Sequence, residues 1–348
     1  MRKYSAAELG LWVKRTAITS AVLLFVVTIV GVLLWRDRAS IDEIGWQPYP
    51  NIPPSLDSVT MTWLGVTTLL FDDGETQILI DGFFSRPSLL DVALGRPVDI
   101  DAATINYVID EYRLRRLAAI IPVHSHYDHA MDIGALANRS SASILGSSST
   151  AQIARGAGVP EDQIVEVSNG GEYSFGQFTV TMIDSVHAPV AWGGSVPFAG
   201  SVDEPLITPA PVSAWREGKS YSIVIAHPYG TTLVQGSAGF LERTLDSVEA
   251  DVVMLGVSLL EGLGRDYAEQ YWQALVTTTG ASHVFAIHFD DFLRPFGEIE
   301  LYPRVIDDFV ETARWLEEIR SRWDTDTRLH LPEFGKTVVL YPQVAPEA

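Results

Sequence analysis

IPVHSHYDHA, residues 121–130, is the stretch around which the rest of this chain is organised. It places three of the 8 histidines of the chain, together with one aspartate, within six positions. Residues two apart in an extended segment point the same way, so His124 and His126 can present their imidazoles to one metal ion. Asp128 and His129 follow where the strand should break into a loop, and they can turn toward a second ion. Imidazole and carboxylate ligands suit zinc, and also iron or manganese.

The flanks of this stretch indicate where it lies in a fold. Residues 117–123 (LAAIIPV) are typical of a buried strand, and residues 131–138 (MDIGALAN) of the start of a helix. The histidines therefore sit at the C-terminal end of a strand, where the loops of layered α/β folds carry ligands. The alternative is a polar surface loop with solvated histidines. A surface loop rarely concentrates the scarce histidines of a chain, which favours a site.

Composition sets limits on the class of protein. A chain of 348 residues, 47% hydrophobic and 20% charged, can bury a substantial core as one large or two small domains. Its formal net charge of −20 repels polyphosphate backbones, which argues against nucleic acid as a partner. The chain has no cysteine, which excludes disulfides and thiolate metal sites.

A membrane anchor is predicted near the N-terminus. Residues 16–35 (TAITSAVLLFVVTIVGVLLW) contain no charge. As a helix they would span ~30 Å, the thickness of the hydrocarbon core of a bilayer. A cleavable signal peptide has a shorter apolar region and a small-residue cleavage site, so an uncleaved anchor is favoured. A buried core helix is the alternative, but no polar face is visible over these residues.

The charges that flank the span predict its orientation. Four basic residues lie in the tail 1–15, whereas two, Arg36 and Arg38, follow the span with Asp37 between them. The positive-inside rule then places residues 1–15 in the cytoplasm and everything after residue 38 outside, which is the periplasm in a Gram-negative bacterium. Residues 36–57 contain four prolines and are expected to be a linker between membrane and domain.

Residues 58–341 are predicted to form one domain of mixed α/β class. Strands and helices come in two successive blocks, which suggests two sheets packed face to face with helices outside. Two further strands should deliver single histidines at their ends, His187 after residues 172–184 and His288 after residues 283–287. The segment 189–215 is long, irregular and rich in proline and glycine, so it is either a lid and substrate wall, with Trp192 and Phe198 as candidates, or a plain surface insertion.

The order of these markers resembles the metallo-β-lactamase-fold hydrolases, and most of all the branch of N-acylphosphatidylethanolamine phospholipase D and the ascorbate-6-phosphate lactonases. His124–His129 matches the H-x-H-x-D-H motif, and Thr62–Gly65 (TWLG) matches the opening strand of that branch. By this resemblance, Asp81 braces the metal loop from behind the ligands. His187 completes the first metal site and His288 the second. The resemblance implies a four-layer αββα sandwich with one or two divalent ions, zinc by preference, at one edge.

One position departs from the family pattern. The segment 236–239 reads GSAG, whereas the family has an aspartate that bridges both metals where this chain has Ser237. Three consequences follow as alternatives: a weak second site, a non-catalytic relative, or replacement of the carboxylate by another residue. Asp290 lies two residues after His288 and would point the same way in an extended segment, so it, or less readily Asp291, is the candidate. The pair could instead brace the ligands or cap a helix.

The implied chemistry is hydrolysis. A divalent ion lowers the pKa of a water that it binds from ~15.7 toward ~7, which gives a metal-bound hydroxide at neutral pH. Asp128 can orient that group and pass its proton to the leaving group. The anchor and the apolar loop favour a phosphodiester or ester of a lipid-like substrate. A lactonase and a metal-binding, non-catalytic relative are the alternatives.

Overall fold

Two β-sheets stacked face to face form the centre of the molecule. The computed structural model describes residues 6–55, 58–191 and 193–341. The first sheet is antiparallel on one side and parallel on the other. Its strands are, in spatial order, β16 (Thr337–Val339), β1 (Thr60–Trp63), β2 (Leu69–Asp72), β3 (Gln77–Ile80), β5 (Leu117–Ile121), β6 (Ser143–Gly146) and β7 (Ile164–Glu166).

The second sheet is likewise mixed. Its strands are, in spatial order, β15 (Arg328–His330), β14 (His283–Ile287), β13 (Val252–Gly256), β12 (Gly230–Gln235), β11 (Ser220–His227), β9 (Phe178–Ser185) and β8 (Gly171–Phe175). The strands from β12 to β15 are parallel, whereas β11 runs antiparallel to both β9 and β12. It follows that β9, β13 and β14 point the same way and end at the same edge of this sheet.

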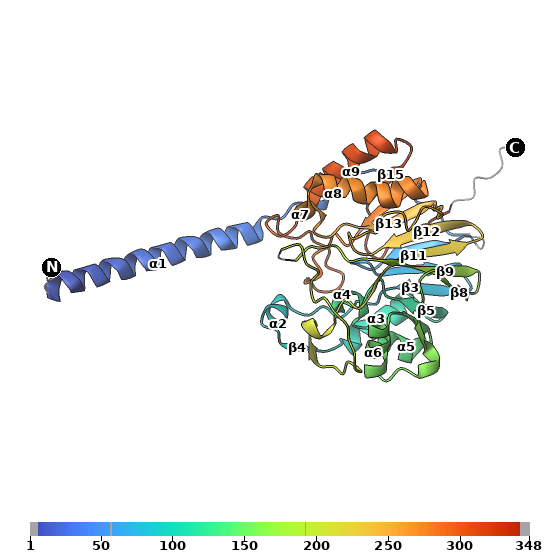
Figure 1. The fold of residues 1–348 in the computed structure, drawn as a ribbon, viewed down its shortest axis with the longest axis horizontal. Helices are drawn as coiled ribbons and strands as arrows, with labels where there is room; N and C mark the ends of the chain where they lie inside the picture. Colours follow the sequence, from blue (N-terminus) through green and yellow to red (C-terminus); the bar gives the residue numbers. More distant parts are fainter. Residues whose placement is uncertain (1–5, 56–57, 192, 342–348) are drawn as a thin grey trace.

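Helices cover the outer face of each sheet, as Figure 1 shows. On one side lie α3 (Ala102–Glu111), α5 (Ile133–Ser140) and α6 (Ser148–Gly156), and on the other α8 (Arg265–Trp272) and α9 (Phe309–Trp323). The remaining helices are α1 (Ala6–Arg36), α2 (Leu89–Ala93), α4 (Tyr127–Ala130) and α7 (Leu260–Leu263). A short two-stranded sheet pairs β4 (Pro97–Val98) with β10 (Ala210–Pro211).

The alternation of side chains along the strands explains the layers. In β3, Ile78 and Ile80 pack between the sheets, whereas Leu79 packs against the helices of the first side. In β5, Ile120 and Ile121 divide between the two cores in the same way. Neighbouring residues of a strand point to opposite faces, so strands that are apolar throughout are buried on both sides. The αββα sandwich predicted from the sequence is confirmed.

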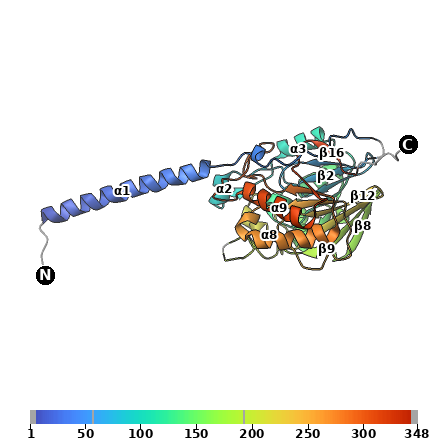
Figure 2. The ribbon, with the colours of Figure 1, turned by 90° about the horizontal axis from the view of Figure 1, so that it is seen from above.

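The N-terminal helix projects from one end of the sandwich (Figures 1 and 2). Its stretch Lys14–Arg36 is long and apolar enough to cross a membrane by length and composition. The helix ends at Arg36, and residues of the predicted linker make contacts with the domain. Arg38 pairs with Pro303 in an isolated β-bridge, and Tyr49 is buried in the main core with its hydroxyl donating to Leu340 O at 2.9 Å. The apolar residues of this segment that are partly buried against the main core are Ala39, Ile41, Ile44 and Trp46.

Candidate metal centre

Three strands deliver the predicted site residues to one edge of the sandwich. The loop after β5 carries His124 and His126, and continues into the short helix α4 with Asp128 and His129. His187 follows the end of β9, and His288 follows the end of β14. Since β9 and β14 are parallel, both histidines lie at the edge where the β5 loop also arrives. The three loops therefore bring the predicted site residues together at one edge of the sandwich.

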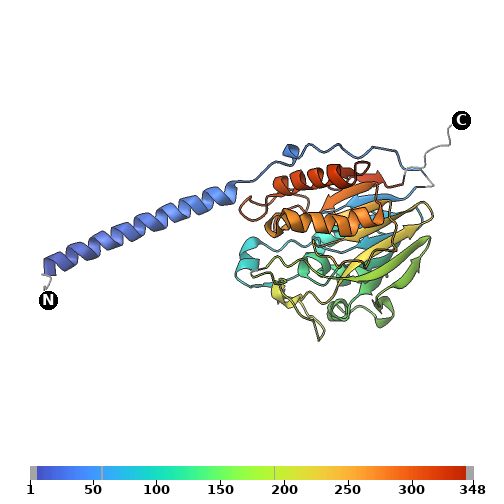
Figure 3. The same cartoon turned by 45° about the horizontal axis from the view of Figure 1, so that its top comes forward.

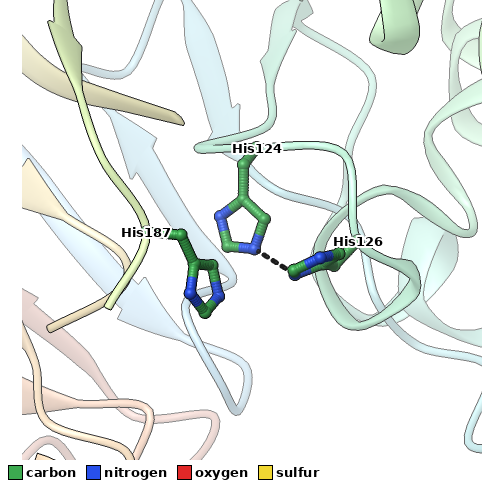
Figure 4. Close-up of side chains that lie close together, drawn as sticks. All are labelled: His124, His126 and His187. Carbon is green, nitrogen blue, oxygen red and sulfur yellow. Dashed lines mark hydrogen bonds between the residues drawn. The ribbon is translucent and has the colours of Figure 1, made fainter. Parts of the chain in front are cut away.

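The first cluster consists of three histidines, shown in Figure 4. One side-chain nitrogen each of His124, His126 and His187 lies within 4.8 Å of the others. His124 Nε2 lies 2.9 Å from His126 Nδ1, and the ring of His187 lies 4.8 and 4.9 Å from the other two, centroid to centroid. The three imidazoles thus converge on one point from two loops.

Backbone carbonyls fix which nitrogen of these rings is free. His126 Nε2 lies 2.8 Å from Pro197 O, and His187 Nδ1 lies 2.7 Å from Ala188 O. A carbonyl accepts but cannot donate, so those nitrogens carry the proton and the opposite nitrogens present lone pairs. Burial lowers the pKa of His126 to about 4 and that of His187 to about 3, which keeps both rings neutral. Neutral imidazoles with an oriented lone pair fit a divalent metal ion.

The second cluster combines a carboxylate with two histidines. Ligand atoms of Asp128, His129 and His288 also lie within 4.8 Å of one another. Asp128 Oδ2 lies 3.4 Å from His129 Nε2 and 3.4 Å from His288 Nε2. The rings of His124 and His129 are only 4.0 Å apart, centroid to centroid, so the two clusters are direct neighbours.

The electrostatics of the second cluster favour a cation. Burial alone would lower the pKa of His129, but the carboxylates of Asp81 and Asp128 raise it to about 10. Burial raises the pKa of Asp128, yet His129 and His288 hold it well below its usual range. A field that stabilises a proton on a buried imidazole also stabilises a divalent ion at the same place. Both donor sets therefore fit metal ions.

Asp81 braces His129, as the resemblance implies. Its Oδ2 lies 2.7 Å from His129 Nδ1, which leaves Nε2 facing Asp128. Its Oδ1 accepts a hydrogen bond from Val123 N at 2.8 Å, which ties it to the start of the histidine loop. Thr67 was missed by the sequence reasoning: its hydroxyl hydrogen-bonds Asp81 and lies 2.8 Å from His129 Nδ1. No sequence signal distinguishes Thr67 from Thr68 beside it.

The backbone is strained where these side chains leave the sheets. Asp81 and His288 both have positive φ, 58° and 60°. Non-glycine residues adopt this left-handed conformation at a cost, and such residues gather at functional sites. At these two positions the turn directs the side chain across the sheet edge toward the clusters.

One cavity opens onto both clusters. It has a volume of about 150 Å³, and its polar lining includes His126 and His187 from one cluster and Asp128 and His288 from the other. Its apolar walls are Tyr127, Ala188, Val190, Pro197, Phe198, Ala238, Leu259 and Phe292. A larger cavity of about 890 Å³ lies between residues 43–47 and α9, and no residue of either cluster lines it.

The segment 189–215 contributes to this cavity in its first part. Phe198 lies with its ring 6.1 Å from that of His126, centroid to centroid, and the neighbouring Pro197 supplies the carbonyl that orients that histidine. The other wall candidate, Trp192, lies outside the described residues. The carbonyl of Pro197 could not be foreseen, because any residue offers the same group.

Ser237 lines the cavity but is poorly placed to act as a ligand. Its Oγ accepts hydrogen bonds from Ala188 N at 3.1 Å and from Gly239 N at 3.2 Å. A hydroxyl has two acceptor lone pairs and one donor, so both lone pairs are used and the O–H remains. In this chain Ser237 holds the His187 loop against the segment that follows β12.

The expectation that Asp290 or Asp291 supplies the missing carboxylate is corrected by their contacts. Asp290 Oδ1 accepts from Val66 N at 2.8 Å, and Asp291 Oδ2 accepts from Arg38 Nη1 at 2.8 Å. Neither belongs to a cluster of potential ligands in the described part of the chain. The inference assumed an extended segment after β14, but His288 has a positive φ of 60°, and Asp290 is instead bound to the backbone of Val66.

Two histidines outside the clusters pair with each other. His283 Nδ1 lies 2.9 Å from His330 Nε2, under the ring of Tyr49. Another, His227, ends β11, with its Nε2 3.6 Å from Asp73 Oδ2. These contacts are with side chains outside both clusters and indicate structural roles for the three histidines.

Comparison with known proteins finds metal-dependent hydrolases. No family model matches the chain. A UPF0173 metal-dependent hydrolase from Roseiflexus sp. (strain RS-1) is 30% identical over 131 residues, which cover 37% of this chain and 48% of the relative. The chain thus spans about half the length of that curated relative.

Solved structures of similar shape include the metallo-beta-lactamase fold protein YhfI from Bacillus subtilis. It is 14% identical with a TM-score of 0.49, over 81% of this chain and 100% of that one. An isothiocyanate hydrolase from Delia radicum gut bacteria is 15% identical with a TM-score of 0.48, over 81% and 99%. CmlA, a diiron beta-hydroxylase from Streptomyces venezuelae, is 13% identical with a TM-score of 0.49, over 83% and 55%.

With TM-scores below 0.5, these structural similarities assign neither a family nor an activity to this chain. The resemblance to metallo-β-lactamase-fold hydrolases that the histidine motif carries is confirmed as a resemblance. The closer likeness to the phospholipase D and lactonase branch stays a prediction.

Proposed function

We propose that this protein is a membrane-anchored, metal-dependent hydrolase. The observation that carries the proposal is the pair of three-residue clusters that share one cavity. His124, His126 and His187 would hold one divalent ion, and Asp128, His129 and His288 a second. Two adjacent ions held by imidazole and carboxylate are a recurrent device for hydrolysis.

The chain's own residues would divide the work around these ions. A bound divalent ion makes water acidic and polarises the oxygen of the bond that is to be cleaved. Asp128 faces both imidazoles of its cluster through Oδ2, and Oδ1 would carry a proton from the attacking water to the leaving group. Asp81 would hold His129 in place, and the carbonyls of Pro197 and Ala188 would do the same for His126 and His187.

The proposed arrangement across the membrane follows the sequence. Residues 16–35 would be an uncleaved span, residues 1–15 a cytoplasmic tail, and residues 58–341 an extracytoplasmic domain. The apolar stretch of α1 supports the span, and the described side chains of that stretch are exposed. The basic residues before the span support the orientation.

The substrate we propose is an ester or phosphodiester of an amphiphilic molecule. Val190, Phe198, Leu259 and Phe292 give the cavity apolar walls above the clusters. At about 150 Å³ the cavity would admit the reacting group but not an acyl chain, which would stay outside. A lactone would also fit this volume, so lactone hydrolysis is the second candidate.

A non-catalytic role is less well supported. Its main argument is Ser237, which lacks the carboxylate expected at that position. Each cluster has three potential ligands without Ser237, and the side chain of Ser237 is engaged with backbone N–H groups. The loss of the bridging carboxylate would therefore weaken the centre rather than abolish it.

The test is hydrolysis by the full chain in detergent, loaded in turn with zinc, iron(II) or manganese. The panel contains phosphodiesters, carboxylic esters and lactones of short and long chain. We expect turnover of one class with at least one metal, and its loss in His124→Ala. Absence of turnover for every substrate class and every metal, with the metal bound, would overturn the proposed hydrolytic activity. It would favour a metal-binding interaction domain instead.

A further inference from the structure

We propose that the end of the sandwich that carries the metal centre lies directly against the bilayer, with the leucines of α2 inserted at the lipid surface. This inference rests on the proposed membrane span of α1. It concerns an interaction surface of the domain itself, whose partner is the lipid into which α1 runs.

The first observation is that the domain begins almost where α1 ends. The helix ends at Arg36, and Asp37 O accepts a hydrogen bond from Arg304 N at 2.8 Å. Arg38 Nη1 donates to Asp291 Oδ2 at 2.8 Å and to Leu301 O at 2.5 Å, and its side chain is mostly buried. One to two residues separate the span from these contacts. The connection is therefore too short to hold the domain at a distance from the membrane.

The second observation concerns which end of the domain faces α1. Strands β9 and β14 are parallel and end at His187 and His288, so the metal centre lies at that end of the second sheet. Asp291, which binds Arg38, follows His288 by three residues. The span is therefore attached at the edge that carries the centre, and Figures 1 and 2 show α1 leaving from that end.

The third observation is an exposed apolar face on α2. Leu89, Leu90 and Leu94 are 41%, 57% and 58% exposed. Leu89 and Leu90 lie in α2 and Leu94 is its C-cap residue, and the three together are called the leucines of α2. In the views of Figures 1 and 3, α2 lies at the end of the domain from which α1 projects.

A second apolar pair lies beside the exit of α1. Val305 and Ile306 are 56% and 46% exposed, and they directly follow Arg304, whose N–H binds Asp37. Trp35, at the last turn of α1, is 41% exposed, and tryptophan is favoured at the interface between lipid and water. These groups and the leucines of α2 would rest on one plane.

A lipid surface is the occupant that fits these facts together. Apolar side chains exposed on a short helix beside a span are typical of segments that dip into the headgroup region. A protein partner would have to share the narrow space that the short connection leaves between domain and bilayer. The cavity at the metal centre would then open toward the lipid surface, and an amphiphile could enter it without leaving the membrane.

The experiment uses the absence of cysteine from the chain. Single variants Leu90→Cys, Leu94→Cys, Val26→Cys and Gln177→Cys of the full chain are labelled with a nitroxide and reconstituted into phosphatidylcholine vesicles. Val26 lies within the proposed span. Gln177 is exposed in the turn before β9, at the opposite end of that strand from His187. The accessibility of each label to oxygen and to a water-soluble nickel complex gives its depth.

We expect labels at 26, 90 and 94 to favour oxygen over nickel, and the label at 177 to favour nickel. Labels at 90 and 94 that behave like the one at 177, with the label at 26 inside the bilayer, would overturn this inference and leave the anchor intact. A label at 26 that behaves like the one at 177 would overturn the proposed membrane anchor, and with it the proposed lipid-contacting surface of the domain.

Discussion

His124 Nε2 lies 2.9 Å from His126 Nδ1, although the two residues are only two positions apart. The opposite nitrogen of His126, Nε2, lies 2.8 Å from Pro197 O, which leaves the Nδ1 lone pair on the side of His124. A hydrogen bond from His124 Nε2 to the lone pair of His126 Nδ1 accounts for this distance, and a metal ion beside both nitrogens would take the place of that hydrogen bond. Burial keeps the pKa of both imidazoles low, so both rings are neutral and each can offer one nitrogen lone pair to a metal ion.

Removal of His124 is therefore expected to empty the first metal site. The variant His124→Ala should lose about one of two bound ions per chain, because the two imidazoles that remain are too few ligands to hold the ion. The measurement is elemental analysis of the full chain purified without chelator. His227→Gln is the matched control, since that histidine belongs to neither cluster. Equal metal content in the two variants would contradict the assignment of His124.

The carboxylate of Asp128 is expected to matter more for turnover than for metal content. In Asp128→Asn the amide oxygen can still face the ion, but the side chain can no longer carry a proton. We expect turnover to fall by roughly 10²–10⁴-fold, the usual contribution of a positioned acid or base. The measurement is steady-state hydrolysis at equal metal loading.

Asp73→Asn is the control for Asp128→Asn, because Asp73 is a buried carboxylate that contacts His227 and lies outside both clusters. Unchanged turnover in Asp128→Asn would remove the proton-transfer role. A loss of metal in proportion to the loss of turnover would show that Asp128 acts only as a metal ligand.

Two substitutions test the role of Ser237, one that removes its hydroxyl and one that introduces a carboxylate. Ser237→Ala leaves Ala188 N and Gly239 N without their acceptor, and an unsatisfied buried donor costs about 1–3 kcal/mol. We expect a lower melting temperature with unchanged metal content, measured by thermal unfolding and elemental analysis. Metal loss in Ser237→Ala at an unchanged melting temperature would show that the hydroxyl is a ligand after all.

The reverse variant, Ser237→Asp, places a carboxylate at the cavity between the clusters. We expect tighter binding of the second ion, measured by competition with a chelator, because a carboxylate adds a negative charge and an oxygen ligand. Weaker binding would contradict the position assigned to residue 237.

Asp307 is expected to make stability depend on pH. Burial raises the pKa of this carboxyl to about 7, with Glu261 and Asp308 adding to the shift and the hydrogen bond from Leu259 N opposing it. Between about pH 4 and pH 7 the folded chain then holds a proton that the unfolded chain has lost. The free energy of unfolding therefore falls as pH rises through this range, by up to roughly 1.4 kcal/mol per unit.

Asp307→Asn tests this linkage. The amide keeps an acceptor for Leu259 N, a residue that lines the cavity, and does not titrate. We expect the loss of melting temperature between pH 5 and pH 8 to be smaller in the variant than in the natural chain. Parallel pH profiles for the two chains would show that Asp307 is ionised in the fold throughout this range.

Sequence predicted the layers and the histidine-rich loop because both follow from local pattern. The apolar runs of β3 and β5 could be assigned to buried strands, and the motif 124–129 fixed which loop carries ligands. Helix ends are less predictable: α3 ends at Glu111, and Arg113 just after it turns with a φ of 51°. That turn depends on packing that no local pattern reveals.

Other contacts could not be predicted because they join distant segments. The role of Asp290 was inferred from its spacing to His288, but His288 has a positive φ and Asp290 is bound to Val66 N from a distant segment. The segment after α1 was interpreted as a linker from its prolines, yet Arg38 and Tyr49 bind residues more than 250 positions away. Spacing is informative only while the backbone is regular.

The measurement that tests the central claim most directly is the number of metal ions per chain. It requires elemental analysis of the full chain, purified in detergent without chelator and supplied with zinc, iron(II) or manganese. The two clusters predict close to two ions per chain for at least one of these metals. One ion per chain would contradict the two-ion centre, and none would contradict the metal centre altogether.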